Sequence, residues 1–396
     1  MRNAVIVDAV RVASGKGKPG GVLSETHPVD LFAHVLKSLV ERNGLDPTRV
    51  DDVIGGCVIQ AGEQSLNISR QAILAAGFPE SVAATTVDRQ CGSSQQAAHF
   101  AAQGVMAGAY DIVIAGGVEI MSRVPMSTSL AGMDPFGPKF AARYPEGLVN
   151  QGISAELIAA KWKLDREALD EFSSRSHQLA AAAASSGAFD SEIIPFPVEV
   201  DGKWIEHKVD ETVRALTTPE GLAKLRPSFE DPVYKERFPQ IDWQITAGNS
   251  SPFTDGASAV LIMGEDVANQ LGLNPRARFH SFAVAGDDPI FMLTAPIPAT
   301  QKVLARAGLS IDDIDVYEVN EAFASVPLAW AHELGADPEK LNPRGGAIAL
   351  GHALGSSGTR LLATMVNYLE STGGRYGLQT MCEGGGMANA TIIERL

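Results

Sequence analysis

Two cysteines that are far apart in the sequence lie in settings that suit thiol chemistry. Cys91 lies in TTVDRQCGSSQQAAHF, between a β-branched stretch and an alanine-rich stretch. This position predicts a thiol at the start of a helix, where unpaired N–H groups and the helix dipole favour a thiolate. Cys382 lies in TMCEGGGMANA, where the glycines let a ligand approach and leave N–H groups free for an oxyanion. The alternative for each is an ordinary buried cysteine, and that interpretation is kept for Cys57, in the apolar run VIGGCVIQ with no partner in view.

A histidine and an asparagine supply the polar groups that thiol chemistry needs. His352 lies in NPRGGAIALGHALGSSG, among glycines and small residues, and is suited to abstract a thiol proton. Asn320 opens NEAF, directly after the strand-like DVYEV. We expect Asn320 to hold a water or donate to an oxyanion and Glu321 to orient a neighbour, with a simple turn as the alternative. His99, on the alanine-rich stretch, is interpreted as merely packed or solvated.

The sequence contains no familiar metal or nucleotide motif. It has neither a CxxC pair nor an HExxH pair. The glycine-rich GKGKPGG at residues 15–21 lacks the Lys-Ser/Thr ending of a phosphate loop, and we interpret it as a surface turn. We therefore expect no metal and no permanently bound cofactor.

The elements that must position these residues alternate between strand and helix. Strands are predicted at residues 4–8, 53–59, 85–87 and 112–115, with helices over 31–40, ended by Gly44, and after Gly92. This is an α/β pattern. Residues from about 121 to 251 differ: they contain loops rich in Pro and Gly and a long helical segment that ends at Gly187, with Ser154 or Asp165 as its cap. We interpret them as an insertion over the main body.

Two pairs of similar segments indicate an internal duplication. Residues 44–54 read GLDPTRVDDVI and residues 308–318 read GLSIDDIDVYE, and each follows an amphipathic segment. GSS at 92–94 and GSS at 355–357 each open a helical segment that leads to a strand-like one. Because order and approximate spacing match, we predict two α/β halves related by a pseudo-twofold axis.

Composition excludes several classes of protein. The 396 residues are 45% hydrophobic and 20% charged, with a formal net charge of −15. That charge argues against a nucleic-acid surface or a basic membrane-surface helix. We expect no signal peptide and no membrane span. Three cysteines, an odd number, argue against a disulfide framework and favour the cytoplasm.

Four motifs in this order resemble the thiolase family along the whole chain: CGSS at Cys91, NEAF at Asn320, GGAIALGHALGSSG around His352 and CEGGG at Cys382. The resemblance implies a duplicated thiolase fold, with βαβαβαββ halves in a layered αβαβα arrangement. The halves would be residues 1–270, including the loop domain at about 121–251, and residues 275–396.

The resemblance also implies an activity and its main residues. The enzyme would cleave 3-ketoacyl-CoA with coenzyme A, or run the reverse Claisen condensation. Cys91 would be the nucleophile that accepts the acyl group, His352 the base that activates it, and Cys382 the acid/base for the carbon proton. A Cys thioester suits this chemistry because the thiolate is both a good nucleophile and a good leaving group.

Further residues are implied in binding roles. Asn320 would hold a water that, with the histidine, lines one oxyanion hole. The second hole would use the N–H groups of the nucleophilic cysteine and Gly384. Arg214 and Ser251 would bind coenzyme A, which is a co-substrate here. The family also implies a homodimer or homotetramer.

Some positions differ from the family's usual pattern, which narrows the choice of substrate. The residues concerned are Ser94, Ala353, Met387-Ala388 and Asn150-Gln151-Gly152. The last replaces the His-Met-Gly of biosynthetic acetoacetyl-CoA thiolases, and so favours a degradative 3-ketoacyl-CoA thiolase, including those for bulky or steroid-derived acyl chains. The alternatives are an acetoacetyl-CoA-specific acetyltransferase, a ketoacyl synthase, which would lack a second cysteine like Cys382, and a non-catalytic lipid-binding relative.

Overall fold

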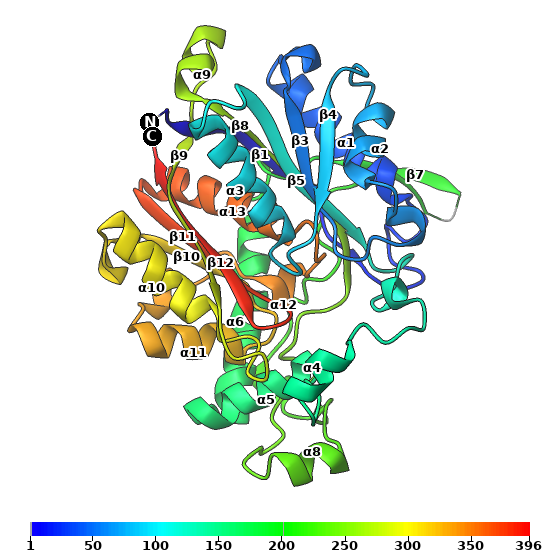
Figure 1. Ribbon diagram of the computed structural model, residues 1–396, viewed down its shortest axis with the longest axis vertical. Coiled ribbons are helices and arrows are strands. Elements are labelled where there is room, and N and C mark those ends of the chain that lie inside the picture. The colour runs from blue at the N-terminus through cyan, green and yellow to red at the C-terminus, as the bar shows by residue number, and fades with distance from the viewer. Residues whose placement is uncertain (1, 201) are drawn as a thin grey trace.

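The computed structural model describes residues 2–200 and 202–396, and it is built around one long path of hydrogen-bonded strands (Figure 1). The path runs β10-β11-β12-β9-β1-β8-β5-β3-β4, with β2 paired to β8. Its strands are β1 (Ala4–Arg11), β2 (Gly15–Lys16), β3 (Asp52–Gly56), β4 (Ala83–Val87), β5 (Ile112–Ile120), β8 (Thr254–Gly264), β9 (Ala277–Gly286), β10 (Val316–Val319), β11 (Tyr376–Glu383) and β12 (Met387–Arg395). β6 (Phe196–Val200) and β7 (Lys203–His207) pair separately.

The α-helices pack on this sheet and fill the inserted region. They are α1 (Pro28–Arg42), α2 (Ile68–Ala75), α3 (Ser93–Met106), α4 (Pro138–Arg143), α5 (Gln151–Trp162), α6 (Arg166–Ser185), α7 (Pro219–Leu222), α8 (Pro232–Arg237), α9 (Glu265–Leu271), α10 (Pro296–Ala307), α11 (Ser325–Leu334), α12 (Ala347–Leu350) and α13 (Ser357–Thr372). No helix among the described residues is both long enough and apolar enough to cross a membrane.

The strands repeat one pairing pattern, which confirms the predicted duplication. In the first half β1 pairs antiparallel with β8, β8 antiparallel with β5, and β5 parallel with β3. In the second half β9 pairs antiparallel with β12, β12 antiparallel with β11, and β11 parallel with β10. The halves join where β1 meets β9 over a short register, Val5–Arg278 and Ile6–Ala277.

The helices and the two half-sheets form five layers, αβαβα. α1 and α2 pack on one half-sheet, and α10 packs on the other (Figure 1). Between them lie α3 and α13, which contact each other; α13 also touches β1 and β8 on one side and β10 and β11 on the other. Alanines of α3, such as Ala97 and Ala101, belong to the same middle core as Leu362, Val366 and Leu369 of α13. The small side chains let the two helices pack closely at the centre, beside the ends of the half-sheets.

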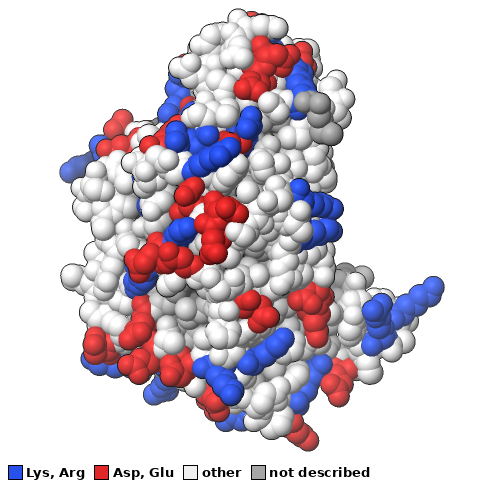
Figure 2. Space-filling view, turned by 90° about the vertical axis from the view of Figure 1, so that its left-hand side faces the viewer, with Lys and Arg blue, Asp and Glu red and all other residues white. Residues whose placement is uncertain are grey.

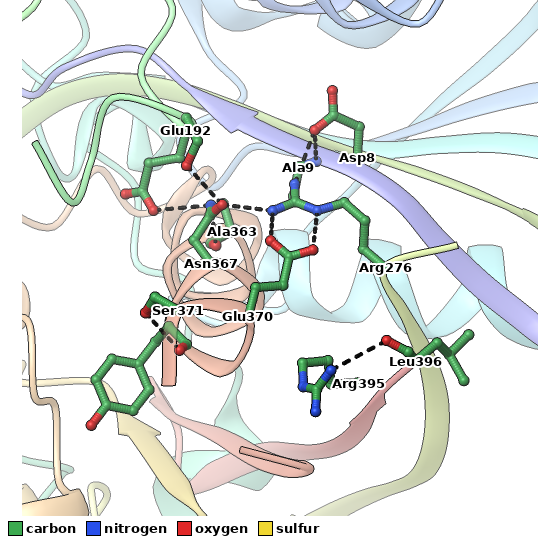
Figure 3. Close-up of polar contacts among 12 residues, drawn as sticks. Asp8, Ala9, Glu192, Arg276, Ala363, Asn367, Glu370, Ser371, Arg395 and Leu396 are labelled. Atoms are coloured by element: carbon green, nitrogen blue, oxygen red, sulfur yellow. Dashed lines mark hydrogen bonds and ion pairs between the residues drawn. The ribbon is translucent and has the colours of Figure 1, made fainter. Parts of the chain in front are cut away.

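A polar network ties the halves together near their junction (Figure 3). The Arg276 guanidinium donates to Asp8 Oδ1 at 3.1 Å, to Glu370 Oε1 at 2.8 Å and to Asn367 Oδ1 at 2.6 Å. Asn367 in turn donates to Glu192 Oε2 at 3.3 Å. These contacts link β1, α13 and the start of β9 in one cluster, so the join does not depend on the short β1–β9 ladder alone.

Charged side chains of both signs share the outer surface. On the face that Figure 2 shows, Lys and Arg interleave with Asp and Glu across the described residues. Within the insertion, Arg237 pairs with Glu146 and Lys235 with Glu230. The basic side chains of these two pairs are thus neutralised locally.

The predicted long helix of the insertion is two helices. α5 begins after Asn150, whose side chain accepts from Ile153 N, and ends at Lys163 with φ 54°. Asp165 caps α6 by accepting from Ala168 N, as predicted. Ser154 is not a cap: it lies inside α5 and donates to Ile290 O at 2.8 Å. The left-handed residue and the new cap break the chain direction between the two helices.

The strand predicted at residues 53–59 ends at Gly56. Cys57, which was expected to have no partner, has a hydrogen-bond partner. Cys57 is buried, as predicted, but its Sγ donates to Glu119 Oε1 at 3.8 Å. The N–H groups of Val58 and Ile59 donate to the same carboxylate at 3.0 and 3.1 Å. Because those N–H groups turn to Glu119 and not to a neighbouring strand, the ladder stops. Burial and the Glu119 charge raise the pKa of the Cys57 thiol well above its ordinary value.

Candidate active site

The structure brings the motifs of both halves around Cys91. Cys91 directly precedes Gly92, the N-cap of α3, and is almost fully buried. Its side chain belongs to a small apolar cluster that includes Leu354, from the histidine motif, and Met381, from the second cysteine motif. Three segments that are distant in the sequence thus meet at the amino-terminal end of the central helix α3.

Burial favours the neutral form of both thiols. Burial raises the pKa of Cys91 to about 12, and the Glu383 charge adds to this, while a hydrogen bond from the Gln151 side chain lowers it. Burial raises the pKa of Cys382 well above its ordinary value as well, and the nearby Cys91 raises it further. The expectation that the helix start would favour a thiolate at Cys91 is thus outweighed by burial. Formation of a thiolate at Cys91 would therefore require a base.

The tautomer of His352 is set by its hydrogen bonds. The Ser357 hydroxyl donates to Ala353 O at 2.8 Å, so the 2.7 Å contact between Ser357 Oγ and His352 Nδ1 requires an N–H at Nδ1. Nε2 therefore carries the lone pair, which accepts a hydrogen bond from Asn320 Nδ2 at 3.4 Å. Burial, with the charge of Arg360, lowers the pKa of His352 to about 3. The imidazole is neutral and can accept a proton at Nε2.

Asn320 and Glu321 face different ways from the end of β10. Asn320 is buried, its N–H donates to Thr380 O at 3.1 Å, and its Oδ1 has no partner among the described residues. Glu321 accepts from Ser176 Oγ at 2.7 Å and from Ile348 N at 3.1 Å. The Asn320 amide is thus available to a ligand beside His352. Glu321 instead holds α12, the short helix that precedes His352.

The glycines after Cys382 are required by a turn and by a close approach. β11 ends at Glu383 and β12 begins at Met387, so three glycines form the turn. Gly385 and Gly386 have φ of 86° and 80°, a conformation that suits only glycine. At Gly384 a Cβ would lie 3.0 Å from Gln90 Oε1. Gly384 therefore packs against the loop that carries Cys91.

The two residues expected to bind coenzyme A lie in different places. Ser251 N donates to Ala322 O at 3.0 Å, so Ser251 adjoins the segment that carries Asn320. Arg214 is exposed on the loop between β7 and α7, and its N–H donates to His177 Nδ1 at 3.2 Å. Among the described residues, no hydrogen bond or ion pair joins the Arg214 side chain to the cysteine segments. The structure therefore leaves the Arg214 side chain at the surface.

Sequence reasoning missed three side chains that lie near the site. Ser357 sets the tautomer of His352, but its GSS motif suggested only a helix start. Gln151 reaches the Cys91 thiol from the first turn of α5, although it was noticed only as a departure from the family's pattern. Glu383 lies inside CEGGG, where the glycines were the visible signal. Among the described residues, no three His, Cys, Asp or Glu side chains come together as metal ligands do.

Comparison with known families gives this geometry its context. The chain matches the model of the thiolase N-terminal domain over residues 4–266 and that of the thiolase C-terminal domain over residues 273–395. The chain belongs to the thiolase family. This thiolase is 48% identical to the steroid 3-ketoacyl-CoA thiolase FadA6 of Mycobacterium tuberculosis, over 100% of this chain and 95% of that protein. It is 47% identical to the 3-ketoacyl-CoA thiolase of Aliivibrio salmonicida, over the full length of both.

A solved structure agrees with the fold. The crystal structure of the Bacillus anthracis acetyl-CoA acetyltransferase matches this thiolase with a TM-score of 0.89 and 37% identity, over 100% of this chain and 99% of that one. The thiolase fold predicted from the motifs is thereby confirmed, and the protein is an enzyme, an acyltransferase of the thiolase class.

Proposed function

We propose that this thiolase cleaves 3-ketoacyl-CoA to acetyl-CoA and a shortened acyl-CoA, or catalyses the reverse condensation, through an acyl group carried on Cys91. The observation that supports the proposal is that Leu354, two residues after His352, and Met381, next to Cys382, pack in one cluster with Cys91 at the start of α3. Cys382 is close enough to Cys91 for that thiol to raise its pKa, and His352 has its lone pair at Nε2. The names of the two relatives, both 3-ketoacyl-CoA thiolases, support the substrate class.

In each half of the proposed reaction, His352 and Cys382 each transfer one proton. His352 takes the Cys91 proton as the sulfur attacks the ketone carbon. The carbon–carbon bond then breaks, and the enolate of acetyl-CoA takes a proton from Cys382. In the second half the Cys382 thiolate removes the proton of the incoming CoA thiol, which attacks the Cys91 thioester; acyl-CoA is released, and the Cys91 sulfur takes back a proton from His352. Asn320 with His352, and the N–H groups of Cys91 and Gly384, would stabilise the oxyanions.

Coenzyme A is proposed to enter past Ser251, with no cofactor bound permanently. Ser251 is supported by its backbone contact to Ala322, which adjoins Asn320. The surface position of Arg214 suits contact with a phosphate of a ligand that extends into solvent, since a guanidinium binds phosphate well. The three cysteines are free in this structure, which supports a reducing compartment, and we propose the cytoplasm.

We further propose a homodimer or a homotetramer, and a division of the chain at residues 1–270 and 275–396 with the loop domain at about 121–251. β4 ends the strand path, and its Ala83 and Thr85 are exposed. An unpaired edge strand offers its backbone groups to another chain, which supports a paired assembly. The division is supported by α9, which separates β8 of the first half from β9 of the second.

The test combines a variant with a substrate panel. Cys91→Ser should lower thiolysis by at least about 10³-fold while the fold is retained, because a hydroxyl is a much weaker nucleophile and leaving group. Mass spectrometry of the wild type mixed with 3-ketoacyl-CoA should find the acyl group on Cys91. Cys57→Ser is the matched control: it alters a buried cysteine outside the proposed mechanism and should keep activity. An adduct confined to Cys57 or Cys382 would overturn the proposal.

The same panel separates the proposed activity from a second candidate, an acetoacetyl-CoA-specific acetyltransferase, which the name of the Bacillus anthracis protein favours. The panel should run from acetoacetyl-CoA through long chains to steroid side chains. Faster turnover of the longer or bulkier substrates supports the degradative function. Turnover of acetoacetyl-CoA alone would favour the second candidate.

A further inference from the structure

Glu383 is a buried carboxyl group beside both cysteines to which the proposed mechanism gives no role. It is 0% exposed, and neither carboxyl oxygen has a hydrogen-bond partner among the described residues. The buried carboxyl of Glu119 differs, since it accepts from Gln64 Nε2 at 2.7 Å and from Gly355 N at 2.9 Å. A buried carboxylate without donors is strongly disfavoured, so Glu383 calls for an explanation.

The Glu383 carboxyl packs against the start of α3. A Cβ added to Gly92 would lie 2.1 Å from Glu383 Oε1, so any larger residue there would have to displace the Glu383 carboxyl. Asn389 lies at the same point: its Nδ2 is 2.8 Å from that Cβ position and donates to Gly92 O at 2.9 Å. Gly92 follows Cys91, and Glu383 follows Cys382. The carboxyl therefore lies beside both sulfur-bearing segments, at the end of the helix that would stabilise a Cys91 thiolate.

Few charged groups face this carboxyl. The loop between β4 and α3 contributes Asp88, Arg89 and Cys91, and β11 contributes Cys382. Burial raises the pKa of Glu383 to about 8; Arg89 opposes that rise and Asp88 adds to it. The negative charge of Glu383 in turn raises the pKa of Cys91. The two groups thus compete to carry one negative charge at the amino-terminal end of α3, and their titrations are coupled.

We propose that Glu383 is a positioning residue for Cys91. It holds a proton in the working enzyme, which leaves the start of α3 free to stabilise the Cys91 thiolate, and it opposes that thiolate once it loses the proton. Activity should then fall at alkaline pH, as Glu383 ionises. This inference rests on the proposed function, in that Cys91 is taken as the nucleophile.

The test is the pH profile of Glu383→Gln, a neutral replacement of the same shape. Between pH 6 and 10 we would measure thiolysis and the rate at which iodoacetamide alkylates Cys91, with labelling followed by mass spectrometry. Above pH 8, where Glu383 of the wild type is ionised, removal of this like charge should raise the Cys91 thiolate fraction, and hence the alkylation rate, about tenfold, whereas below pH 7 the two rates should agree. Thiolysis at pH 7 should stay within about threefold of the wild type, and its alkaline limb should move to higher pH.

A matched control and a second variant make the result decisive. Glu318 is also buried, also without a hydrogen-bond partner among the described residues, and its pKa is also raised to about 8 by burial. It lies on β10, and Glu318→Gln should leave Cys91 alkylation unchanged. Glu383→Met, a second neutral replacement, should repeat the shift if Glu383→Gln fails to fold.

The outcomes separate this inference from the proposed function. If wild-type Cys91 carries the acyl group but neither neutral replacement shifts the alkylation profile, the role of Glu383 is wrong and the function stands. Loss of thiolysis at pH 7 with unchanged alkylation would show that the Glu383 carboxyl itself transfers a proton, which also overturns the inference. Absence of any acyl group on wild-type Cys91 would refute the proposed function instead.

Discussion

Replacement of Arg11 by methionine should destabilise the folded protein by about 3–5 kcal/mol. Arg11 is 1% exposed on β1 and donates through Nε to Glu192 Oε1 at 2.7 Å. Its two terminal nitrogens donate to Asp210 at 2.7 and 3.0 Å. Both carboxylates are themselves buried, so Arg11→Met leaves two buried charges without their cation. Loss of one partner of a buried ion pair costs about 3–5 kcal/mol, far more than loss of a surface pair.

The effect should depend on pH with a definite sign. Burial acts to raise the pKa of Asp210, but the Arg11 charge, its hydrogen bonds and the Ser14 N–H outweigh this and lower it below 3.8. A lowered pKa in the folded state means that the ionised carboxylate contributes stability above the unfolded pKa. That contribution is lost as pH falls through the folded pKa. The difference in free energy of unfolding between wild type and Arg11→Met should therefore be largest near pH 6–7 and should shrink as pH falls below about 4.

Urea denaturation, monitored by tryptophan fluorescence at one fixed protein concentration, measures the loss of stability. The control is Lys37→Met, which breaks an exposed helical pair with Glu41 at 3.8 Å. That pair is open to solvent, and its loss should change the urea midpoint little. If Arg11→Met shifted the midpoint no more than Lys37→Met, or by the same amount at pH 3.5 as at pH 7, the account of the buried cluster would be refuted.

The other predictions concern the chemistry. His352→Ala should slow acylation of Cys91 by about 10²–10⁴-fold in rapid-quench experiments, the usual contribution of a positioned base; unchanged acylation would remove His352 from the mechanism. Ser357→Ala should slow the same step by about 3- to 10-fold, because one neutral hydrogen bond that holds the imidazole is lost, and an unaltered rate would mean that packing alone sets the tautomer. Cys382→Ser should still accept an acetyl group from acetyl-CoA on Cys91, yet fail to exchange the methyl protons of acetyl-CoA with deuterated water; normal exchange by mass spectrometry would assign the carbon proton to another group.

Local sequence determined much of this protein. The start of α3 after Gly92, the cap at Asp165 and the turn glycines of CEGGG follow from residue types within a few positions. The order of the motifs was enough to predict the family and the duplicated fold, because matched order over a whole chain is unlikely to arise by chance.

Tertiary structure decided how the site residues behave. Cys91 looked like a thiolate at a helix start, but the second half of the chain covers it, and burial raises its pKa to about 12. Cys57 looked partnerless because Glu119, its acceptor, lies 62 positions away. In the sequence, Glu383 is one acidic residue among glycines. The folded half-sheets place its carboxyl against Gly92. Desolvation, and contacts between groups distant in the chain, depend on which surfaces meet, and only the folded arrangement of the two halves sets that.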